Sequence, residues 1–259
     1  MAVFLPLHVW AYFRTFVAII TPKIMYEYRG LHDIFFIALY CGVTFLAVVA
    51  CLYPLLRRGN AFVGDEFKSS RRLRRWTAAL LAAMAASHVW WYAVGQWWLA
   101  DDWLVRTITV IMLDRMTLVP LTMAVLLAML QDRRRPLWPW LVMQLPVVIF
   151  AIVGIDERSS FCGCELPHYW QLAVIAVFIT YYIYALWQYG RWLLDNYADL
   201  DHKEVWQGLV FALALLAVYV IYTSNAGELM REYLSQVISI VIIVFLVWRV
   251  ETLQELEEN

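Results

Sequence analysis

The chain has 259 residues, of which 63% are hydrophobic and 16% are charged, and its formal net charge is −1. A soluble domain usually holds about 45–50% apolar residues, and the mean hydropathy of +0.64 is that of a membrane protein. No excess of basic residues points to a nucleic-acid surface, and no segment alternates as the strands of a membrane barrel do. The composition therefore predicts an all-α, polytopic membrane protein.

Residues 1–30 are apolar and aromatic, but Pro6, His8 and Arg14 interrupt them. They lack the basic start and the small-residue cleavage site of a signal peptide. We expect an amphipathic segment lying in the membrane interface. An eighth span and a start codon assigned too early are the alternatives.

Seven apolar runs follow, each long enough for a membrane helix or nearly so. They form the predicted seven-helix transmembrane bundle, which extends over residues 31–250. The predicted spans are Leu31–Leu56, Trp76–Trp98, Leu104–Leu130, Leu137–Gly154, Tyr169–Tyr189, Trp206–Thr223 and Tyr233–Val250.

Basic residues between the spans set the expected orientation, because Lys and Arg favour the cytoplasmic side. One side carries thirteen of them and the other carries six, with Arg115 inside a span. The predicted topology places the C-terminus in the cytoplasm and the N-terminus outside, in a cell inner membrane. Residues 251–259 are polar and helix-forming, so we expect the last span to continue as a cytoplasmic signalling helix; a frayed end is the alternative.

The third span holds Asp114 and Arg115 side by side near its middle. An ionisable group at that depth costs at least ~2.5–3.5 kcal/mol on insertion scales. Neighbouring residues of a helix point about 100° apart. We therefore expect each of the two to find a partner on another helix.

Other polar residues lie at a similar depth: His88 in the second span, Gln144 in the fourth and Tyr181 in the fifth, whereas the centres of the last two spans are apolar. The functional interpretation is a ligand or proton site, and the alternative is interhelical hydrogen bonding without a ligand. Aromatic and polar residues above this depth would line an outward pocket, unless they are ordinary interfacial aromatics. The candidate ligand-binding residues are His88, Trp91, Tyr92, Gln96, Asp114, Arg115, Gln144 and Tyr181.

The loop between the fourth and fifth spans offers Cys162, Cys164 and His168. Thiolate and imidazole groups are ligands for zinc or copper. A disulfide between the two cysteines is favoured on the oxidising outer side. The sequence leaves a metal site, a disulfide and no special role open.

Several chemistries are missing from the sequence. No lysine lies within a span, which excludes a retinal Schiff base, and no nucleophile elbow or phosphate-binding loop is present. We expect no catalytic residue and no cofactor. A small transporter or a membrane-embedded enzyme stays open because Pro120 and Pro146 could bend their spans, although no internal repeat supports a transporter.

Two segments carry a resemblance, LDRMTLVPLTMAVL at 113–126 and YGRWLLDNYADLDHKEVW at 189–206. They resemble the seven-transmembrane sensory input domains of bacterial histidine kinases and AraC-like helix-turn-helix signalling proteins, over about residues 31–259. Residues 1–30 and Arg115 have no counterpart in that pattern.

The resemblance implies a receptor for an unknown small molecule. It would act on a cytoplasmic kinase or transcription regulator in the same chain or on another, and it would make no direct nucleic-acid contact itself. A homodimer is compatible with such an input domain. The resemblance also implies a cytoplasmic loop that clamps the last helix, with the candidate signalling residues Asp195, Tyr197, Asp199, His202, Glu204 and Arg249.

Overall fold

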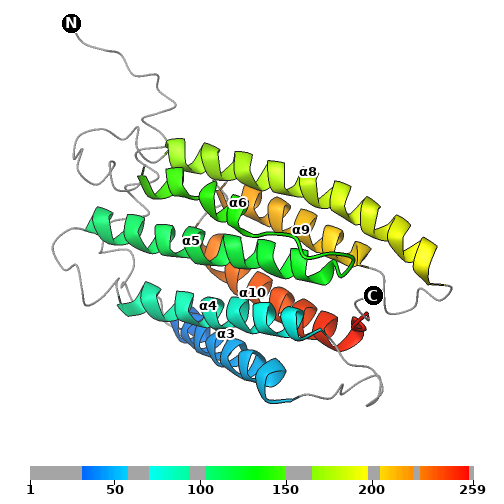
Figure 1. The fold of residues 1–259 in the computed structure, drawn as a ribbon. Coiled ribbons are helices and arrows are strands. Elements are labelled where there is room, and N and C mark those ends of the chain that lie inside the picture. The colour runs from blue at the N-terminus through cyan, green and yellow to red at the C-terminus, as the bar shows by residue number, and fades with distance from the viewer. Residues whose placement is uncertain are drawn as a thin grey trace, which may run out of the picture.

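The computed structural model describes residues 31–57, 70–93, 103–149, 165–197, 205–223 and 228–256, and within these ranges the chain is helical with no strand. The predicted all-α class is therefore confirmed. Successive helices run in opposite directions through one bundle (Figure 1). The described helices are α3 (Leu31–Leu56), α4 (Arg71–Ala93), α5 (Trp103–Met129), α6 (Trp138–Val142), α8 (Glu165–Asn196), α9 (Trp206–Thr223) and α10 (Glu228–Thr252).

The helix bounds follow the predicted spans closely where an apolar run is continuous. α3 and α9 have the predicted ends, and α5 is shifted by one residue at each end. α4 begins five residues before the predicted span, at Arg71, because arginine is a good helix former and extends the helix beyond the apolar run. α8 likewise continues to Asn196.

The fourth predicted span is interrupted. α6 ends at Val142, Met143 and Gln144 form a turn, and the helix resumes over residues 145–149. Pro146 explains the break, because it has no backbone N–H to donate and disfavours helical geometry in the residue before it. Residues 150–154 of that span lie outside the described residues.

Four of the described helices contain a segment long and apolar enough to cross a membrane. The chain therefore has the character of a helical membrane protein. These segments are Ile34–Leu56, Met112–Met129, Tyr169–Asn196 and Tyr233–Thr252. The described apolar parts of α6 and α9 are shorter. The mean hydropathy of α4 is too low for it to count among these membrane-crossing segments, since arginines, small residues and His88 make up much of it.

α4 lies at the centre of one half of the bundle, where it contacts α3, α5 and α10. Its buried face carries small residues such as Ala78, Ala85 and Ser87, which allow neighbouring backbones to approach closely. α5 also contacts α6, α8 and α9, so it joins the two halves. Large apolar side chains such as Phe35, Phe45 and Val244 stay exposed, as expected of residues that face lipid.

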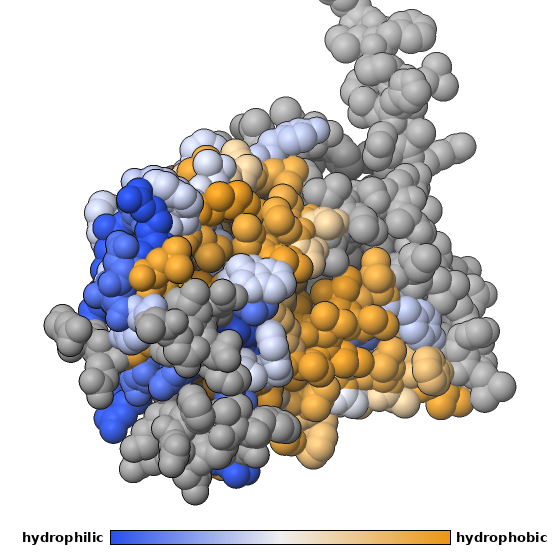
Figure 2. Space-filling view, turned by 90° about the vertical axis from the view of Figure 1, so that its right-hand side faces the viewer, coloured by the Kyte–Doolittle hydropathy of each residue, from blue (hydrophilic) through white to orange (hydrophobic). Residues whose placement is uncertain are grey.

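Arginines gather where α3, α5, α8 and α10 end and α4 and α9 begin, and we call this the basic end. Figure 2 looks onto this end: hydrophilic residues occupy one part of it, and hydrophobic side chains cover the adjoining flank. At the opposite end the described helices carry Arg106 and Arg231. The described arginines of the basic end are Arg57, Arg71, Arg72, Arg74, Arg75, Arg133, Arg134, Arg135, Arg191 and Arg249.

Candidate functional site

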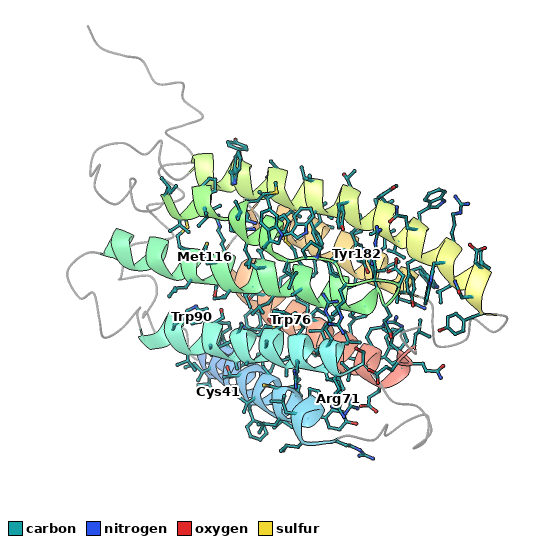
Figure 3. All side chains as sticks on the ribbon, viewed as in Figure 1. Cys41, Arg71, Trp76, Trp90, Met116 and Tyr182 are labelled. Carbon is teal, nitrogen blue, oxygen red and sulfur yellow. The ribbon has the colours of Figure 1, made fainter. Side chains whose placement is uncertain are left out.

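Asp114 of α5 is held by the neighbouring helix α4. Its Oδ1 atom accepts hydrogen bonds from Ser87 Oγ at 2.6 Å and from Trp90 Nε1 at 2.9 Å. Ser87 and Trp90 are three residues apart, so they lie on one face of α4; Figure 3 labels Trp90 there. The expected partner on another helix is therefore present for Asp114.

His88, next to Ser87, connects α4 to two further helices. Its Nε2 lies 3.3 Å from Gln236 Oε1 on α10, and its Nδ1 lies 2.8 Å from the carbonyl oxygen of Met84. Its own carbonyl accepts a hydrogen bond of 2.7 Å from the Tyr40 hydroxyl of α3. The rings of Tyr40 and His88 are 4.6 Å apart.

Both ring nitrogens of His88 thus face oxygen atoms, since the Gln236 amide is oriented with its Oε1 toward the ring. A neutral imidazole has one N–H and donates only once, whereas an imidazolium donates from both nitrogens. A neutral ring can therefore donate to only one of the two acceptors, either the Met84 carbonyl or the Gln236 amide oxygen.

These contacts define the polar cluster: Tyr40, Ser87, His88, Trp90, Asp114 and Gln236. It joins α3, α4, α5 and α10. The sequence predicts His88 and Asp114 as members of the site but not Gln236, because the centre of the last span is apolar. The adjacent polar residues Ser235 and Gln236 are the signal that could have indicated it. Gln236 is only 5% exposed, so it is a buried polar residue of α10.

The other predicted ligand residues lie elsewhere. Arg115 is half-buried, and no residue in the described part of the chain forms a hydrogen bond or ion pair with it. Gln144 is buried in the turn after α6, where its side-chain amide has no hydrogen-bond partner among the described residues. Tyr181 packs on Trp140, with ring centroids 5.3 Å apart. Among the described residues, none of these three bonds to or stacks on a member of the polar cluster, so they are not part of it.

The remaining residues of the predicted pocket and of the metal site are not described at their side chains. Trp91 and Tyr92 lie on α4 and His168 on α8, but only their backbone is placed. Gln96, Cys162 and Cys164 lie outside the described residues. No group of three metal-binding side chains occurs among the residues that the structure describes. The outward pocket and the cysteine site stay predictions.

A second set of buried polar groups lies at the basic end. Arg74 of α4 is 3.5 Å from Glu251 of α10, with side chains 10% and 0% exposed, and Arg74 also donates to the carbonyl oxygen of Arg57. Arg135 forms a two-pronged pair with Asp132, at 2.5 and 2.9 Å, in the connection from α5 to α6. We call the ion pairs Arg74–Glu251 and Arg135–Asp132 the basic-end network.

The chain after α10 packs at the same end of the bundle, beside Gln131. The helix ends at Thr252, so the expected helical continuation covers only two residues beyond Val250. Leu253 and Leu256 are buried, and the Gln131 side chain donates to the Gln254 carbonyl at 2.9 Å and accepts from the Leu256 N–H at 2.8 Å. Apolar burial and these two bonds replace the bonds that a longer helix would make.

The predicted signalling loop is described only at its start. Asp195 is exposed at the end of α8, and the Tyr197 ring packs edge-on against Trp192, with centroids 5.7 Å apart. Asp199, His202 and Glu204 lie outside the described residues. Arg249 is 2% exposed and lies within electrostatic reach of the hydroxyls of Tyr182 and Tyr189 on α8. The clamp between this loop and Arg249 stays a prediction.

Comparisons with protein-family models, with curated proteins and with solved structures find no match to this chain. No similar protein therefore supplies a function.

Proposed function

We propose that the chain is a seven-span sensory domain of the cell inner membrane, in which the polar cluster responds to a proton or a small ligand. The last helix, α10, would carry the response to a cytoplasmic kinase or transcription regulator. One observation carries this proposal: the hydrogen bond between His88 and Gln236 joins the polar cluster directly to α10. The sequence resemblance to sensory input domains supports it independently.

α10 is suited to transmit such a change along its length. Gln236 and Arg249 are thirteen residues apart on one continuous helix, a distance of about 20 Å along its axis. Beyond Arg249, Glu251 is paired with Arg74 and the following segment is bonded to Gln131. A shift of α10 at Gln236 would therefore alter contacts at the basic end.

The orientation in this proposal follows from the arginines. Their excess at the basic end fits a cytoplasmic location, because short connections rich in Arg and Lys favour that side. The C-terminus lies at the same end of the bundle (Figure 1). An output module joined to α10, in the same chain or bound to it, would then lie in the cytoplasm.

A ligand or proton shifts a conformational balance only by its difference in affinity for the two states. The test uses the full chain in nanodiscs with an environment-sensitive fluorophore on a cysteine introduced at Gln254, in a background without the native cysteines. Protons are the probe, from pH 8 to pH 5. We expect the wild-type signal to change with pH, His88→Gln to abolish the change and Asp114→Asn to reduce it.

Ser239→Ala is the matched control, because Ser239 lies on α10 and, among the described residues, its hydroxyl bonds only to the Ser235 carbonyl of its own helix. This variant should keep the wild-type response. A fluorophore signal that stays constant with pH in the wild type would overturn proton sensing, and a response that survives in both cluster variants would overturn the role of the cluster. Water access to α5 from both faces in a cysteine scan would favour transport instead.

A further inference from the structure

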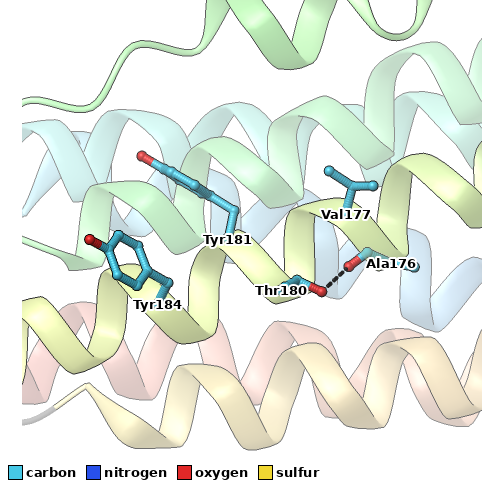
Figure 4. Close-up of a pocket in the computed structure, with 5 residues that line it drawn as sticks. All are labelled: Ala176, Val177, Thr180, Tyr181 and Tyr184. Atoms are coloured by element: carbon cyan, nitrogen blue, oxygen red, sulfur yellow. Dashed lines mark hydrogen bonds between the residues drawn. The ribbon is translucent and has the colours of Figure 1, made fainter.

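One partly exposed side of α8 has a shallow, open groove. Its five lining residues all come from this helix and are mainly apolar (Figure 4). The hydroxyl of Thr180 donates to the Ala176 carbonyl at 2.9 Å, so its proton is used within the helix. Val177 and Tyr184 are about half exposed. The groove therefore presents a hydrocarbon-like surface to its surroundings.

The groove leads toward polar and cationic groups at the basic end. Tyr184 Oη accepts a hydrogen bond of 2.7 Å from Gln188 Nε2, and Gln188 Oε1 accepts one from Arg133 in the connection after α5. One turn further along α8, the Arg191 guanidinium lies 4.9 Å from the centre of the exposed Trp187 ring. Two arginines are thus held at one end of an apolar groove.

The spacing along α8 matches the depth of one leaflet. From Ala176 to Trp187 is eleven residues, or about 16 Å of helix, and half of a bilayer's hydrocarbon core is about 15 Å. Thr180, Tyr184, Gln188 and Arg191 follow one another at helical spacing, so they lie along one side of the helix. A lipid whose headgroup lies at the level of Trp187 and Arg191 would therefore have its acyl chains at the depth of the groove, which extends over residues 176–184.

The charge balance favours an anionic headgroup. The described carboxylate nearest to Arg133 is Asp132, at 4.0 Å from Nε, but both Asp132 oxygens are bonded by Arg135. Among the described residues, no acidic side chain pairs with Arg191, whose cation is placed on an aromatic ring instead. The side chain of Arg133 is 57% exposed and is held in place by Gln188.

We propose that this site binds one anionic phospholipid of the leaflet at the basic end, with an acyl chain in the α8 groove and the phosphate between Arg133 and Arg191. Gln188 and Tyr184 position Arg133 for this contact. The site is separate from the polar cluster, and its occupation does not depend on the proposed sensory role.

Native mass spectrometry of the detergent-solubilised chain tests this, with phosphatidylglycerol and phosphatidylcholine as the probes. We expect one phosphatidylglycerol to be retained preferentially, and Arg133→Gln/Arg191→Gln to weaken its binding by roughly tenfold or more, since the variant loses both cations that would face the phosphate. Thr180→Trp should weaken it as well by filling the groove.

The matched controls make the same changes of charge and of side-chain size at positions outside the proposed site. Arg71→Gln/Arg75→Gln removes two exposed arginines at the same end on α4, and α5 lies between α4 and α8 in Figure 1. Val244→Trp adds a tryptophan to an exposed position of α10. Equal loss of binding in the controls, or equal retention of the two lipids, would overturn the proposal.

Discussion

The polar cluster and the basic-end network both hold acidic side chains between helices of the bundle, but they do so with different partners. In the polar cluster, the Asp114 carboxylate accepts hydrogen bonds from the neutral side chains of Ser87 and Trp90. In the basic-end network, each carboxylate is paired with an arginine, Glu251 with Arg74 and Asp132 with Arg135. One region thus relies on hydrogen bonds and the other on opposite charges.

This difference decides what each region does when a charge changes. A hydrogen-bonded group with neutral partners can gain or lose a proton while its neighbours stay uncharged. Loss of one member of a buried ion pair instead leaves an uncompensated charge, which costs about 3–5 kcal/mol. The proposed sensory response therefore fits the polar cluster better than the basic-end network, whose ion pairs are suited to fix the end of α10.

The largest expected effect is that of Arg74→Ala. It leaves the fully buried Glu251 carboxylate without its arginine and removes the bond to the Arg57 carbonyl. We expect the free energy of unfolding to fall by about 3 kcal/mol or more. Reversible unfolding in mixed micelles followed by circular dichroism measures this.

Two further variants sharpen that result. Arg71→Ala, at an exposed position of the same helix, should change stability by less than about 0.5 kcal/mol. Glu251→Gln should restore part of the loss when it is combined with Arg74→Ala, because the buried charge is then gone. Additive effects of the two substitutions would show that the pair is not coupled.

A packing change near the basic end should have the next largest effect. A Cβ atom at Gly208 of α9 would lie 2.5 Å from the Tyr182 hydroxyl oxygen, and Tyr182 is fully buried. We expect Gly208→Ala to lower the free energy of unfolding by about 1–3 kcal/mol through overpacking. The same unfolding measurement applies.

Tyr182→Phe should rescue this variant. It removes the clashing oxygen, which has no hydrogen-bond partner in the part of the chain that the structure describes, and the next ring atom would be 3.6 Å from the new Cβ. Gly42→Ala is the control, since open space surrounds Gly42 and alanine is the better helix former by about 1 kcal/mol. Destabilisation by Gly42→Ala to the same extent would contradict the steric explanation.

The sequence predicted the helices well because their signal is local. Long apolar runs bounded by charged or turn residues define α3, α5 and α9 almost to the residue. The fourth span was wrong as one continuous helix, although Pro146 carried the information. The end of α10 depends on Gln131, a residue 123 positions before Gln254, and no local pattern reports such a contact.

The candidate site was predicted only in part, for a similar reason. Asp114 and His88 are rare residue types at membrane depth, so their presence alone is informative. Tyr40 and Ser87 are ordinary in apolar helices, and only the packing of α3 and α5 against α4 gives them a role. Equal depth is also not contact: Gln144 and Tyr181 match the depth of the cluster but lie on other elements.

The smallest expected effect is the difference in stability between two substitutions of Asp114, which distinguishes the role of its hydrogen bonds from the role of its charge. Asp114→Asn keeps an oxygen that can accept from Ser87 and Trp90, whereas Asp114→Ala leaves both donors without this acceptor. We expect the alanine variant to be less stable than the asparagine variant by about 1 kcal/mol, the scale of interhelical hydrogen bonds in membranes. Thermal unfolding of the two variants side by side measures this difference.

Since asparagine keeps the bonds but not the charge, a signalling defect in Asp114→Asn with wild-type stability would show that the cluster uses its charge to respond. If the two variants are equally stable, the hydrogen bonds to α4 do not hold these helices together, and the contrast with the basic-end network would then rest on charge alone.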